Sequence, residues 1–312
     1  MIIVTGGAGF IGSNLIYALN ARGNKEIVIV DRLDRSSKFL NLNALDFVDL
    51  IDPDDDRLAE RCSAAEAIFH LGACTDTTET DGRYMVETNF TFSKRLLHLA
   101  LERKLPFIYA SSAAVYGDGQ KGFKEEPAYE NSLNVYAASK QMLDRYVRAQ
   151  LPRAKSPLLG LRYFNVYGPQ EGHKGAMASA AFHFYQQLKS DGAMKLFEGS
   201  REFVRDFVLV DDAVSVTLEL FDLGVSGIFN CGTGRPRSFY DVALTLGELE
   251  SKREAITFIP FPAHLEGKYQ AFTQADLERL RGVGCEHRFS TLEEGIARYH
   301  LALMDAGGYL TR

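Results

Sequence analysis

The sequence predicts an α/β protein, with a doubly wound parallel sheet and a smaller lobe toward the C-terminus. Short apolar, β-branched runs alternate with helical stretches through the first half, and a glycine-rich turn follows the first run. Strands that alternate with helices favour right-handed crossovers and therefore parallel pairing. The chain has 312 residues, of which 46% are hydrophobic, and this suffices for one domain or two closely joined lobes.

The first predicted turn lies in Met1-Ile-Ile-Val-Thr-Gly-Gly-Ala-Gly-Phe-Ile-Gly12, which leads from a strand into a helix. Gly6 can adopt a positive φ without steric cost. Gly9 lets the backbone approach a diphosphate, and Gly12 lets the helix pack close to the sheet. The first N–H groups of the helix then face the diphosphate. Because the turn directly follows a strand, it indicates a Rossmann-like dinucleotide site rather than an ordinary glycine turn.

Further helices and strands follow in alternation. We expect helices at residues 11–21, 84–104 and 134–149, and strands at residues 26–31, 66–70, 106–111 and 158–163. In a parallel sheet the ligand lies at the carboxyl ends of the strands. The segments at such ends, which we expect to share one edge, are the glycine turn, Asp31, Gly72-Ala73, Ser111-Ser112 and Asn165.

The second half of the chain is less regular. We expect a loop at 168–175, a helix at 176–188, short strands at 207–210 and 228–230 that extend the sheet, and a strand at 256–260. The predicted division assigns residues 1–168 and about 205–245 to an NAD(P)-binding Rossmann domain. Residues about 169–204 and 246–312 then form a substrate-binding lobe that covers the cofactor site.

Composition excludes several classes of protein. The net charge is −6 and the charges are interspersed, so we expect no nucleic-acid or membrane partner. No apolar run reaches about 18 residues, the length of a membrane span. The strand and turn at the N-terminus leave no room for a signal peptide, which favours a cytoplasmic location. The four cysteines, Cys62, Cys74, Cys231 and Cys285, form no C-x-x-C pair, so we expect reduced thiols and no metal site.

The residues after the second strand bear on the choice of cofactor. Asp31 lies about 20 residues past the glycine turn, where an acidic residue accepts hydrogen bonds from the adenosine ribose and favours NAD. Arg32 and Lys38 are two cations that could hold a 2′-phosphate, which favours NADP. Alternatively, both are solvated surface charges. We expect NADP, with NAD as the alternative.

Tyr136-Ala-Ala-Ser-Lys140 places a tyrosine and a lysine four residues apart, on one face of a helix. An ammonium close to a phenol lowers the tyrosine pKa toward the working pH. Tyr136 is then a candidate general acid or base for a hydroxyl group that is oxidised. Ser112 ends the preceding strand and could donate a hydrogen bond to the same oxygen. The spacing alone is common, but it gains weight from the glycine turn and from the order along the chain.

These residues resemble the extended short-chain dehydrogenase/reductases that act on nucleotide sugars. The matching stretches are Thr5-Gly-Gly-Ala-Gly-Phe-Ile-Gly12, Ser111-Ser-Ala-Ala-Val-Tyr-Gly117, Tyr136 with Lys140, Arg162-Tyr-Phe-Asn-Val-Tyr-Gly-Pro169 and Arg205-Asp-Phe-Val-Leu-Val-Asp211. The resemblance implies that Tyr136 does acid/base work, that Lys140 holds the nicotinamide ribose and that Arg205 contacts the substrate diphosphate. It also implies a homo-oligomer, with a pentamer suggested.

The resemblance implies two sets of binding residues. The cofactor set is Gly6, Gly9, Phe10, Ile11, Gly12, Asp31, Arg32, Lys38, Leu71, Gly72, Ala73, Cys74, Thr75, Thr88, Asn89, Lys140 and Val166. The substrate set is Asn165, Ala176, His183, Phe197, Glu198, Gly199, Ser200, Arg205 and Tyr269. Three residues depart from the family pattern: Leu71 replaces a glutamate, Ala176 a serine and Arg32 an asparagine.

A narrower resemblance, to the ADP-heptose 6-epimerases within this family, is carried by four stretches. They are Cys74-Thr-Asp-Thr-Thr-Glu79, Glu171-Gly-His-Lys-Gly-Ala-Met-Ala178, Phe197-Glu-Gly-Ser200 and Tyr269-Gln-Ala-Phe-Thr-Gln-Ala-Asp276. It implies conversion of ADP-D-glycero-β-D-manno-heptose to its L-glycero epimer, a step that supplies heptose for the inner core of lipopolysaccharide.

Inversion of carbon 6 requires redox chemistry, because this carbon has no neighbouring carbonyl to acidify its C–H. Oxidation to a ketone and return of the hydride to the other face invert the centre, and the cofactor is regenerated. The ketone must turn over in the site, so a second proton-transfer group is needed, and the resemblance implies Lys174. From spacing alone Lys174 is an exposed loop lysine, and His183 is either at the substrate or packed in the lobe.

Three alternatives remain at this point. A 4,6-dehydratase is disfavoured because Ala113-Ala114 follow Ser112, where an acid pair is needed. A hexose 4-epimerase would use Tyr136 without Lys174. A non-catalytic nucleotide sensor on the same fold is a third reading, but such proteins commonly lose the tyrosine or the lysine, and this chain keeps both.

Overall fold

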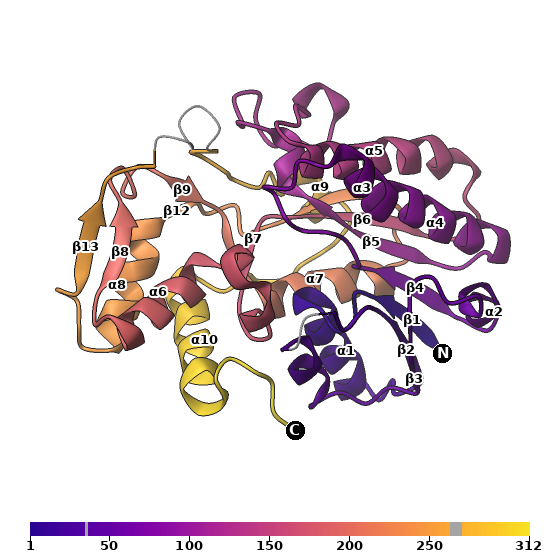
Figure 1. Ribbon diagram of the computed structural model, residues 1–312. Coiled ribbons are helices and arrows are strands. Elements are labelled where there is room, and N and C mark those ends of the chain that lie inside the picture. The colour runs from indigo at the N-terminus through magenta and orange to yellow at the C-terminus, as the bar shows by residue number, and fades with distance from the viewer. Residues whose placement is uncertain (35–36, 263–269) are drawn as a thin grey trace.

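The computed structural model describes residues 1–34, 37–262 and 270–312. Its centre is a sheet of seven parallel strands in the order β3-β2-β1-β4-β5-β6-β11 (Figure 1). The strands are β1 Ile2–Thr5, β2 Ile27–Val30, β3 Asp49–Ile51, β4 Ala67–His70, β5 Phe107–Ser112, β6 Leu158–Tyr163 and β11 Gly227–Cys231. The predicted doubly wound parallel sheet is therefore confirmed.

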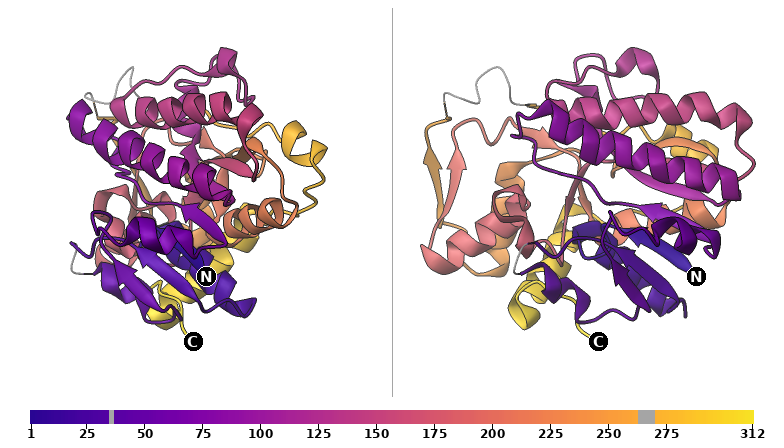
Figure 2. Two further views of the ribbon diagram at one scale, coloured as in Figure 1. Left: turned by 90° about the vertical axis from the view of Figure 1, so that its right-hand side faces the viewer. Right: turned by 45° about the vertical axis from the view of Figure 1, so that its right-hand side comes forward.

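Alternate residues of each strand face opposite layers of helices. Ile2 and Val4 pack into the hydrophobic cluster that includes the helices α1 (Phe10–Ala21) and α7 (Val210–Asp222). Ile3, between them, packs into the cluster on the other face, with α2 (Leu58–Ser63), α4 (Phe92–Arg103) and α5 (Val135–Gln150). This period of two is the geometry of a strand buried on both sides. Figures 1 and 2 show the sheet between these two helical layers.

The helix expected at 84–104 is interrupted by a π-helical turn. It consists of α3 (Gly82–Val86), the π turn Glu87–Thr91 and α4. The extra residue of a π turn changes the direction of the side chains within it. Here Asn89 is buried in the turn. Its side-chain amide accepts a hydrogen bond from the N–H of Cys74 and donates one to the carbonyl of Cys74. The turn thus fixes the segment that follows β4.

One strand prediction is wrong. The predicted strand 228–230 lies within β11 and extends the sheet, but β10 (Phe207–Leu209) does not. β10 pairs in parallel with β7 (Asn165–Tyr167) in a separate two-stranded sheet. Because β7 starts only two residues after β6 ends, the chain leaves the central sheet at this point, and β10 follows it.

The second lobe has its own hydrophobic cluster, shown on the left of Figure 1. It is built from α6 (Ala180–Ser190), α8 (Phe239–Leu249), α10 (Leu292–Ala306) and the pair β8 (Met194–Phe197) and β13 (Ile256–Ile259). Val242 and Ala243 of α8 lie in this cluster, although the predicted boundary at 245 assigns them to the first domain. The division into domains remains a prediction, and packing groups α8 with the lobe.

The remaining short elements connect these layers. They are the 3₁₀ turns Lys38–Leu42, Ala113–Tyr116, Pro127–Tyr129, Leu151–Arg153 and Gly172–Met177, the antiparallel pair β9 (Val204–Arg205) and β12 (Arg237–Ser238), and α9 (Glu278–Gly282).

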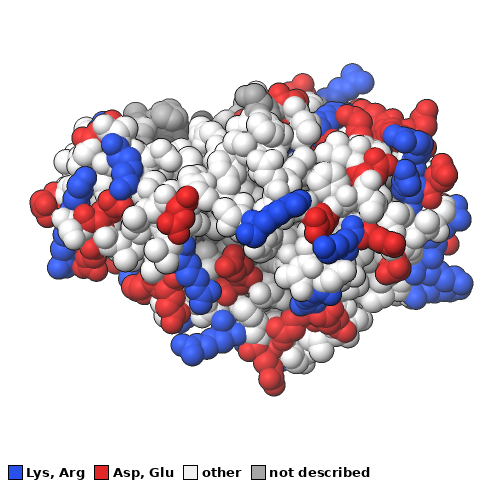
Figure 3. Space-filling model, turned by 90° about the horizontal axis from the view of Figure 1, so that it is seen from below, with Lys and Arg blue, Asp and Glu red and all other residues white. Residues whose placement is uncertain are grey.

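The surface charges and the cysteines are arranged as follows. On the face shown in Figure 3, basic and acidic side chains alternate without a large basic area. All four cysteines are free. Among the described residues, no helix has both the length and the apolar character needed to cross a bilayer, and no group of His, Cys, Asp or Glu is arranged to hold a metal ion.

Candidate active site

The turn between β1 and α1 has the geometry of a phosphate cradle. Gly6 has a φ of 68°, and its N–H donates to the carbonyl of Val30 at 2.9 Å. A Cβ on Gly12 would lie 2.1 Å from the carbonyl oxygen of Gly6, so only glycine fits there. No side chain caps α1 and its first turn has no acidic residue, which leaves its N–H groups for an anion. The turn therefore fits the diphosphate of a dinucleotide.

Asp31 stands directly after β2, and its carboxylate is buried and well supplied with donors. It accepts hydrogen bonds from the N–H of Ala8 at 2.8 Å, from the N–H of Arg32 at 2.7 Å and from Nζ of Lys38 at 2.5 Å. The Arg32 side chain instead pairs with Asp52, at 3.4 Å, and with Asp54. The two predicted cations are thus both present at this edge, and both are engaged by carboxylates.

The segment after β4 lies against the glycine turn. The N–H of Gly72 donates to Oγ1 of Thr5 at 3.1 Å, and a Cβ on Gly6 would lie 2.6 Å from the nitrogen of Gly72. Asn89 then holds Cys74 through its N–H at 2.7 Å and its carbonyl at 2.9 Å. β1 and β4 are adjacent strands whose crossovers run in opposite directions, and this is where a doubly wound sheet binds its ligand.

A chain of hydrogen bonds behind this segment fixes the protonation of His70. Ser93 donates to the carbonyl of Asn89 at 2.6 Å, so it can only accept from Nε2 of His70, at 2.6 Å. Nδ1 of His70 therefore accepts from the hydroxyl of Thr5, at 2.6 Å. Burial, with a smaller effect of the Lys140 charge, lowers the pKa of His70 to about 3. The imidazole is neutral and carries its proton on Nε2.

Tyr136, Lys140 and Ser112 meet at the carboxyl end of β5. Asn134 caps α5 through the N–H of Ala137 at 2.8 Å, which places Tyr136 in the first turn of the helix. Tyr136 lies near Ser112, whose hydroxyl acts to lower the pKa of the tyrosine. Nζ of Lys140 donates to the carbonyl of Ala110 at 2.9 Å. The structure thus brings Tyr136 and Ser112, which were predicted to act on one hydroxyl, near Lys140, which was predicted to lower the Tyr136 pKa.

The expected lowering of the Tyr136 pKa is not found in this structure. Burial raises the pKa of Tyr136, and the Ser112 hydroxyl opposes this effect only in part. Burial also lowers the pKa of Lys140 to about 8, although the Asp144 charge acts in the opposite direction. A partly buried phenol and a buried ammonium both lose solvation by water, and this loss outweighs the attraction on which the prediction rested.

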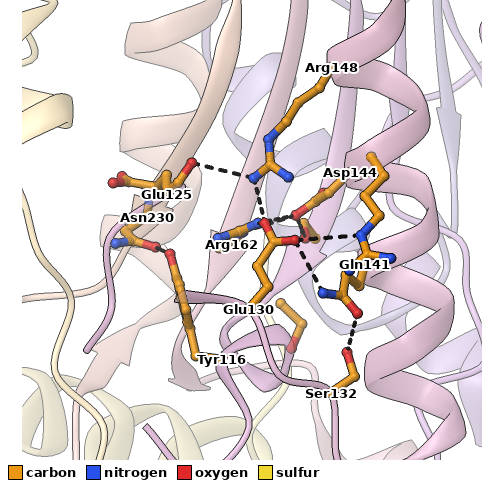
Figure 4. A network of polar contacts seen from close by, with 12 residues as sticks. Tyr116, Glu125, Glu130, Ser132, Gln141, Asp144, Arg148, Arg162 and Asn230 are labelled. Carbon is orange, nitrogen blue, oxygen red and sulfur yellow. Dashed lines mark hydrogen bonds and ion pairs between the residues drawn. The ribbon is translucent and has the colours of Figure 1, made fainter. Parts of the chain in front are cut away.

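A buried ionic network supports α5 from behind (Figure 4). Asp144 accepts from Tyr109 at 2.9 Å, from Ser111 at 3.0 Å and from Nε of Arg162 at 2.9 Å. Arg162 also pairs with Glu130, and its guanidinium lies 4.8 Å from the centre of the Tyr116 ring. Asp144 lies one turn beyond Lys140 on the same face of α5, so this network fixes the helix that carries Tyr136 and Lys140.

Lys174 lies in the 3₁₀ turn Gly172–Met177, which precedes α6. Its Nζ is 5.1 Å from the centre of the Phe10 ring at the start of α1. Burial lowers the pKa of Lys174, and the nearby Glu171 carboxylate opposes this shift. Glu171 is itself fully buried, and accepts from the N–H of Gly168 at 3.2 Å and from the N–H and hydroxyl of Ser179 at 2.5 and 2.7 Å. The carboxylate thus joins both ends of the loop that carries Lys174.

The predicted substrate residues are spread along the edge of the second lobe. Asn165 accepts from Thr273 at 3.4 Å at the start of β7. Arg205 in β9 donates to the carbonyl of Val204 at 3.1 Å and lies 5.6 Å from the Phe239 ring. The ring of His183 makes an edge contact with Phe182.

The turn after β8 holds the remaining described members. Gly199 has a φ of 86°, and the N–H of Ser200 donates to the carbonyl of Phe197 at 3.0 Å. Arg201 lies 3.6 Å from the centre of the Tyr240 ring. Glu198 follows β8, Ala176 is an exposed residue of the Lys174 loop, and Tyr269 lies outside the described residues.

The rest of the predicted cofactor set is placed as follows. Phe10 and Ile11 open α1, Leu71, Ala73 and Thr75 follow β4, Thr88 lies in the π turn and Val166 in β7. Thr88 forms a hydrogen bond with Tyr84. A separate surface hollow of about 510 Å³, lined by Lys124, Glu125, Asp276, Arg279 and their neighbours, includes none of the predicted site residues.

Sequence reasoning missed several residues that shape the site. Asp144, Glu130, Glu171 and Asp206 are buried carboxylates, and Asn41 is a buried amide. Asp206, next to Arg205, accepts from the N–H groups of Thr233, Gly234 and Ala275 at 2.7, 2.8 and 2.9 Å. A possible signal for Asp144 was its spacing of four and eight residues from Lys140 and Tyr136. The others pair with segments far away in the chain, and no local pattern indicates them.

Comparison with known proteins agrees with this geometry. The NAD dependent epimerase/dehydratase family matches residues 2–232. The solved ADP-L-glycero-D-manno-heptose-6-epimerase of Helicobacter pylori is 30% identical, with 97% of this chain and 96% of that chain covered and a TM-score of 0.86. The UDP-glucose 4-epimerase of Thermotoga maritima, solved with UDP-glucose, is 28% identical, covers 97% and 98% and has a TM-score of 0.84. A UDP-N-acetylglucosamine 4-epimerase from Methanobrevibacter ruminantium, 21% identical over 96% and 98% with a TM-score of 0.84, shares the fold.

Proposed function

Since this chain belongs to the NAD dependent epimerase/dehydratase family, we propose that it inverts carbon 6 of ADP-D-glycero-β-D-manno-heptose. The product is the L-glycero epimer, used for the inner core of lipopolysaccharide. The observation that carries the proposal is the placement of Lys174, whose ammonium lies against Phe10. Phe10 follows β1 and Tyr136 lies beside the end of β5, with β4 between these strands. This placement supports a pair of proton-transfer groups, with Tyr136 near the end of β5 and Lys174 near the start of α1.

A nicotinamide dinucleotide is the cofactor of this family. The glycine turn would hold its diphosphate, Asp31 its adenosine ribose and Lys140 its second ribose. The chemistry that such a group supplies when bound is reversible hydride exchange with carbon 6 of the sugar.

The chain's own residues then manage the proton of the carbon 6 hydroxyl. Tyr136, with Ser112 as hydrogen-bond partner, removes or returns this proton on one side of the site. After the ketone has turned over, its oxygen points away from Tyr136, and Lys174 carries out the proton transfer at this oxygen. Lys174 returns a proton to this oxygen in one direction of the reaction and removes it in the other. Removal near neutral pH requires a neutral amine and therefore a lowered pKa, and burial lowers the pKa of Lys174.

NADP is the proposed form of the dinucleotide, because Arg32 and Lys38 both stand at the ribose end. For a 2′-phosphate to bind, at least one of these two cations must leave its aspartate partner and pair with the phosphate instead. The pairing of Arg32 with Asp52 and Asp54 favours NAD as the second candidate. Titration of the cofactor-free protein with NADP and with NAD measures the two affinities. Equal affinities would contradict the NADP proposal.

A hexose 4-epimerase is the second candidate function, supported by the 28% identity with the Thermotoga maritima UDP-glucose 4-epimerase. The test is incubation of the pure protein with ADP-D-glycero-β-D-manno-heptose or with UDP-glucose. The carbon 6 proton signal of the heptose is followed by NMR, and the carbon 4 signal of the hexose serves as the comparison. An equilibrium mixture of heptoses with unchanged UDP-glucose supports the proposal. Conversion of UDP-glucose alone overturns it.

Substrate binding through Arg205 has its own test. Replacing Arg205 with alanine removes a guanidinium that would hold the substrate diphosphate, so the KM for the ADP-sugar should rise on the order of ten- to a hundredfold. The affinity for the dinucleotide should not change. Equal losses in both would point to a folding defect.

We also propose that the chain forms a homo-oligomer, which light scattering can test, with a pentamer as the expected state.

A further inference from the structure

A hydrogen-bonded bridge joins the glycine turn to the loop that carries Lys174. Its centre is Asn41, in the 3₁₀ turn Lys38–Leu42, with a fully buried side chain. Nδ2 of Asn41 donates to the carbonyl of Ala8 at 3.0 Å and to the carbonyl of Gln170 at 3.1 Å. It also lies 3.1 Å from Nδ1 of His173, the residue before Lys174. One amide group therefore contacts both segments.

The orientation of this amide is determined by its partners. Backbone carbonyls only accept hydrogen bonds, so the nitrogen of Asn41 and not its oxygen must face Ala8 and Gln170. Its oxygen, also buried, has no hydrogen-bond partner among the described residues. The donor side of the amide thus faces the two segments.

Other contacts make the two segments one unit. Nε2 of Gln170 donates to the carbonyl of Asn41 at 3.0 Å, and Gln170 adopts a φ of 76°, which is uncommon for a residue with a side chain. Nδ2 of Asn14 donates to the carbonyls of Phe10 and Pro169 at 2.9 and 3.0 Å. The start of the Lys174 loop is thus held by α1 at Pro169 and by the 3₁₀ turn Lys38–Leu42 at Gln170.

The same bridge reaches the residues around the cofactor. Ala8 is held from both sides, because its N–H donates to Asp31 at 2.8 Å while its carbonyl accepts from Asn41. Lys38, which pairs with Asp31, begins the 3₁₀ turn that contains Asn41. A shift of Asn41 would therefore be felt both at the glycine turn and at Lys174.

We infer that Asn41 is a positioning residue, which holds the Lys174 loop against the glycine turn so that proton transfer by Lys174 depends on it. This inference rests on the proposed function, which assigns the second proton transfer to Lys174. Asn41 acts through the loop and is not proposed to contact the substrate or the transferred proton.

A double-mutant cycle tests this dependence. The variants are Asn41→Ala, Lys174→Met and the double variant, each measured for kcat and KM. Misplacing a reacting group by about 1 Å can cost on the order of a hundredfold in rate, and we expect a loss of this order in kcat for Asn41→Ala. In the Lys174→Met background the same change should have little further effect, because coupled sites are not additive.

Asn20→Ala is the matched control. The amide of Asn20 also donates to two carbonyls, those of Asn24 and Asp46, at 2.8 and 2.9 Å, at the far end of α1. Its loss removes the same kind of hydrogen bonds without touching the bridge, so kcat should change less than threefold in either background. Hydrogen exchange of residues 168–179 in the cofactor-free protein provides a readout apart from activity. It should be faster in Asn41→Ala and unchanged in Asn20→Ala.

The outcomes distinguish the role of Asn41 from the proposed role of Lys174. Independent, multiplicative losses in the double variant, or unchanged exchange of the loop in Asn41→Ala, overturn the role of Asn41. Unchanged turnover in Lys174→Met overturns the proposed second proton transfer, whatever Asn41 does. If Asn41→Ala does not fold, Asn41→Leu, which fills a similar volume without the amide, replaces it in the same cycle.

Discussion

The two proposed proton-transfer groups stand on different kinds of support. Tyr136 lies in a helix of 16 residues, which a buried ionic network around Asp144 and Arg162 fixes to the sheet. Lys174 lies in a loop, which a single buried carboxylate, Glu171, and the amide bridge of Asn41 hold in place. The helix positions its group through a buried ion pair with the central sheet. The loop positions its group through hydrogen bonds to the backbone of other segments.

This difference determines where the site is rigid and where it can adjust. The carboxylate of Asp144 and the guanidinium of Arg162 are both completely buried, so neither can be moved without leaving a charge unpaired. The loop around Lys174 depends on backbone carbonyls and N–H groups, which can exchange partners at smaller cost. We expect the helix side to remain fixed and the loop side to follow the ligand.

The largest effect is expected from Tyr136→Phe, which removes the phenol and keeps the ring. General acid–base catalysis contributes roughly two to four orders of magnitude, so kcat should fall about a thousandfold. The affinity for the dinucleotide, measured by fluorescence titration, should stay within a few-fold of the original. Activity within a few-fold of the unmodified protein would remove Tyr136 from the chemistry and leave the helix side without a proton-transfer group.

The second effect concerns stability on the helix side. Asp144→Asn removes a charge from the buried network and leaves Arg162 with Glu130 as its remaining carboxylate, so the free energy of unfolding should fall by about 3 kcal/mol. Urea unfolding measures this change. Ser132→Ala, at the margin of the same network, removes one hydrogen bond to Gln141 and should cost about 1 kcal/mol. Equal losses would show that the network is no more rigid than its edge.

The third effect concerns the loop side. Lys174→Met keeps much of the side-chain volume and removes the ammonium, so kcat should fall about a hundredfold. Lys189→Met is the control, because the ammonium of Lys189 also lies over an aromatic ring, that of Tyr185 at 5.2 Å, but is exposed and pairs with Glu250 at 2.7 Å. A variant at Lys174 that turns over as fast as the control would favour a hexose 4-epimerase that uses Tyr136 alone.

The smallest effect is a pH dependence of the free energy of unfolding, which arises from His70 in the sheet behind the cofactor site. His70 has a pKa of about 3 when folded and about 6.5 when unfolded. Between these values only the unfolded chain binds the proton, so stability falls with decreasing pH by roughly 1.4 kcal/mol per pH unit. In His70→Gln this contribution disappears. Urea unfolding at pH 6.5 and at pH 5 measures it, and equal slopes in both proteins would show that His70 is protonated in the folded state.

Much of the helix side and of the predicted cofactor edge could be predicted from the sequence. The glycine turn, Asp31, Ser112, Tyr136 and Lys140 all stand at places that local rules define: the end of a strand, the start of a helix, or a spacing of four. The structure places each of them at the carboxyl edge of the sheet, as expected. The pKa of Tyr136 was predicted in the wrong direction, because spacing gives proximity to Lys140 and contains no information on burial.

The loop side could be predicted only through resemblance. Lys174 has no local pattern that distinguishes it from an exposed lysine, and its burial depends on Phe10, which is 164 positions away in the sequence. Asn41 and Glu171 were not predicted at all, since each is defined by partners that only the folded chain brings near. The β10 strand was misplaced for the same reason, because its partner is β7 and not the sheet.

The four free thiols offer a practical handle. Cys62, Cys231 and Cys285 are at most 1% exposed, and burial raises the pKa of each. Cys74 is only partly buried, and it lies close enough to Tyr136 and Lys140 for its charge to raise the pKa of both. A small alkylating reagent applied to the native protein should therefore attach a label at Cys74 first. The natural chain thus already contains a single-position reporter beside its chemistry, and protection from labelling would measure occupancy of the site without any engineered residue.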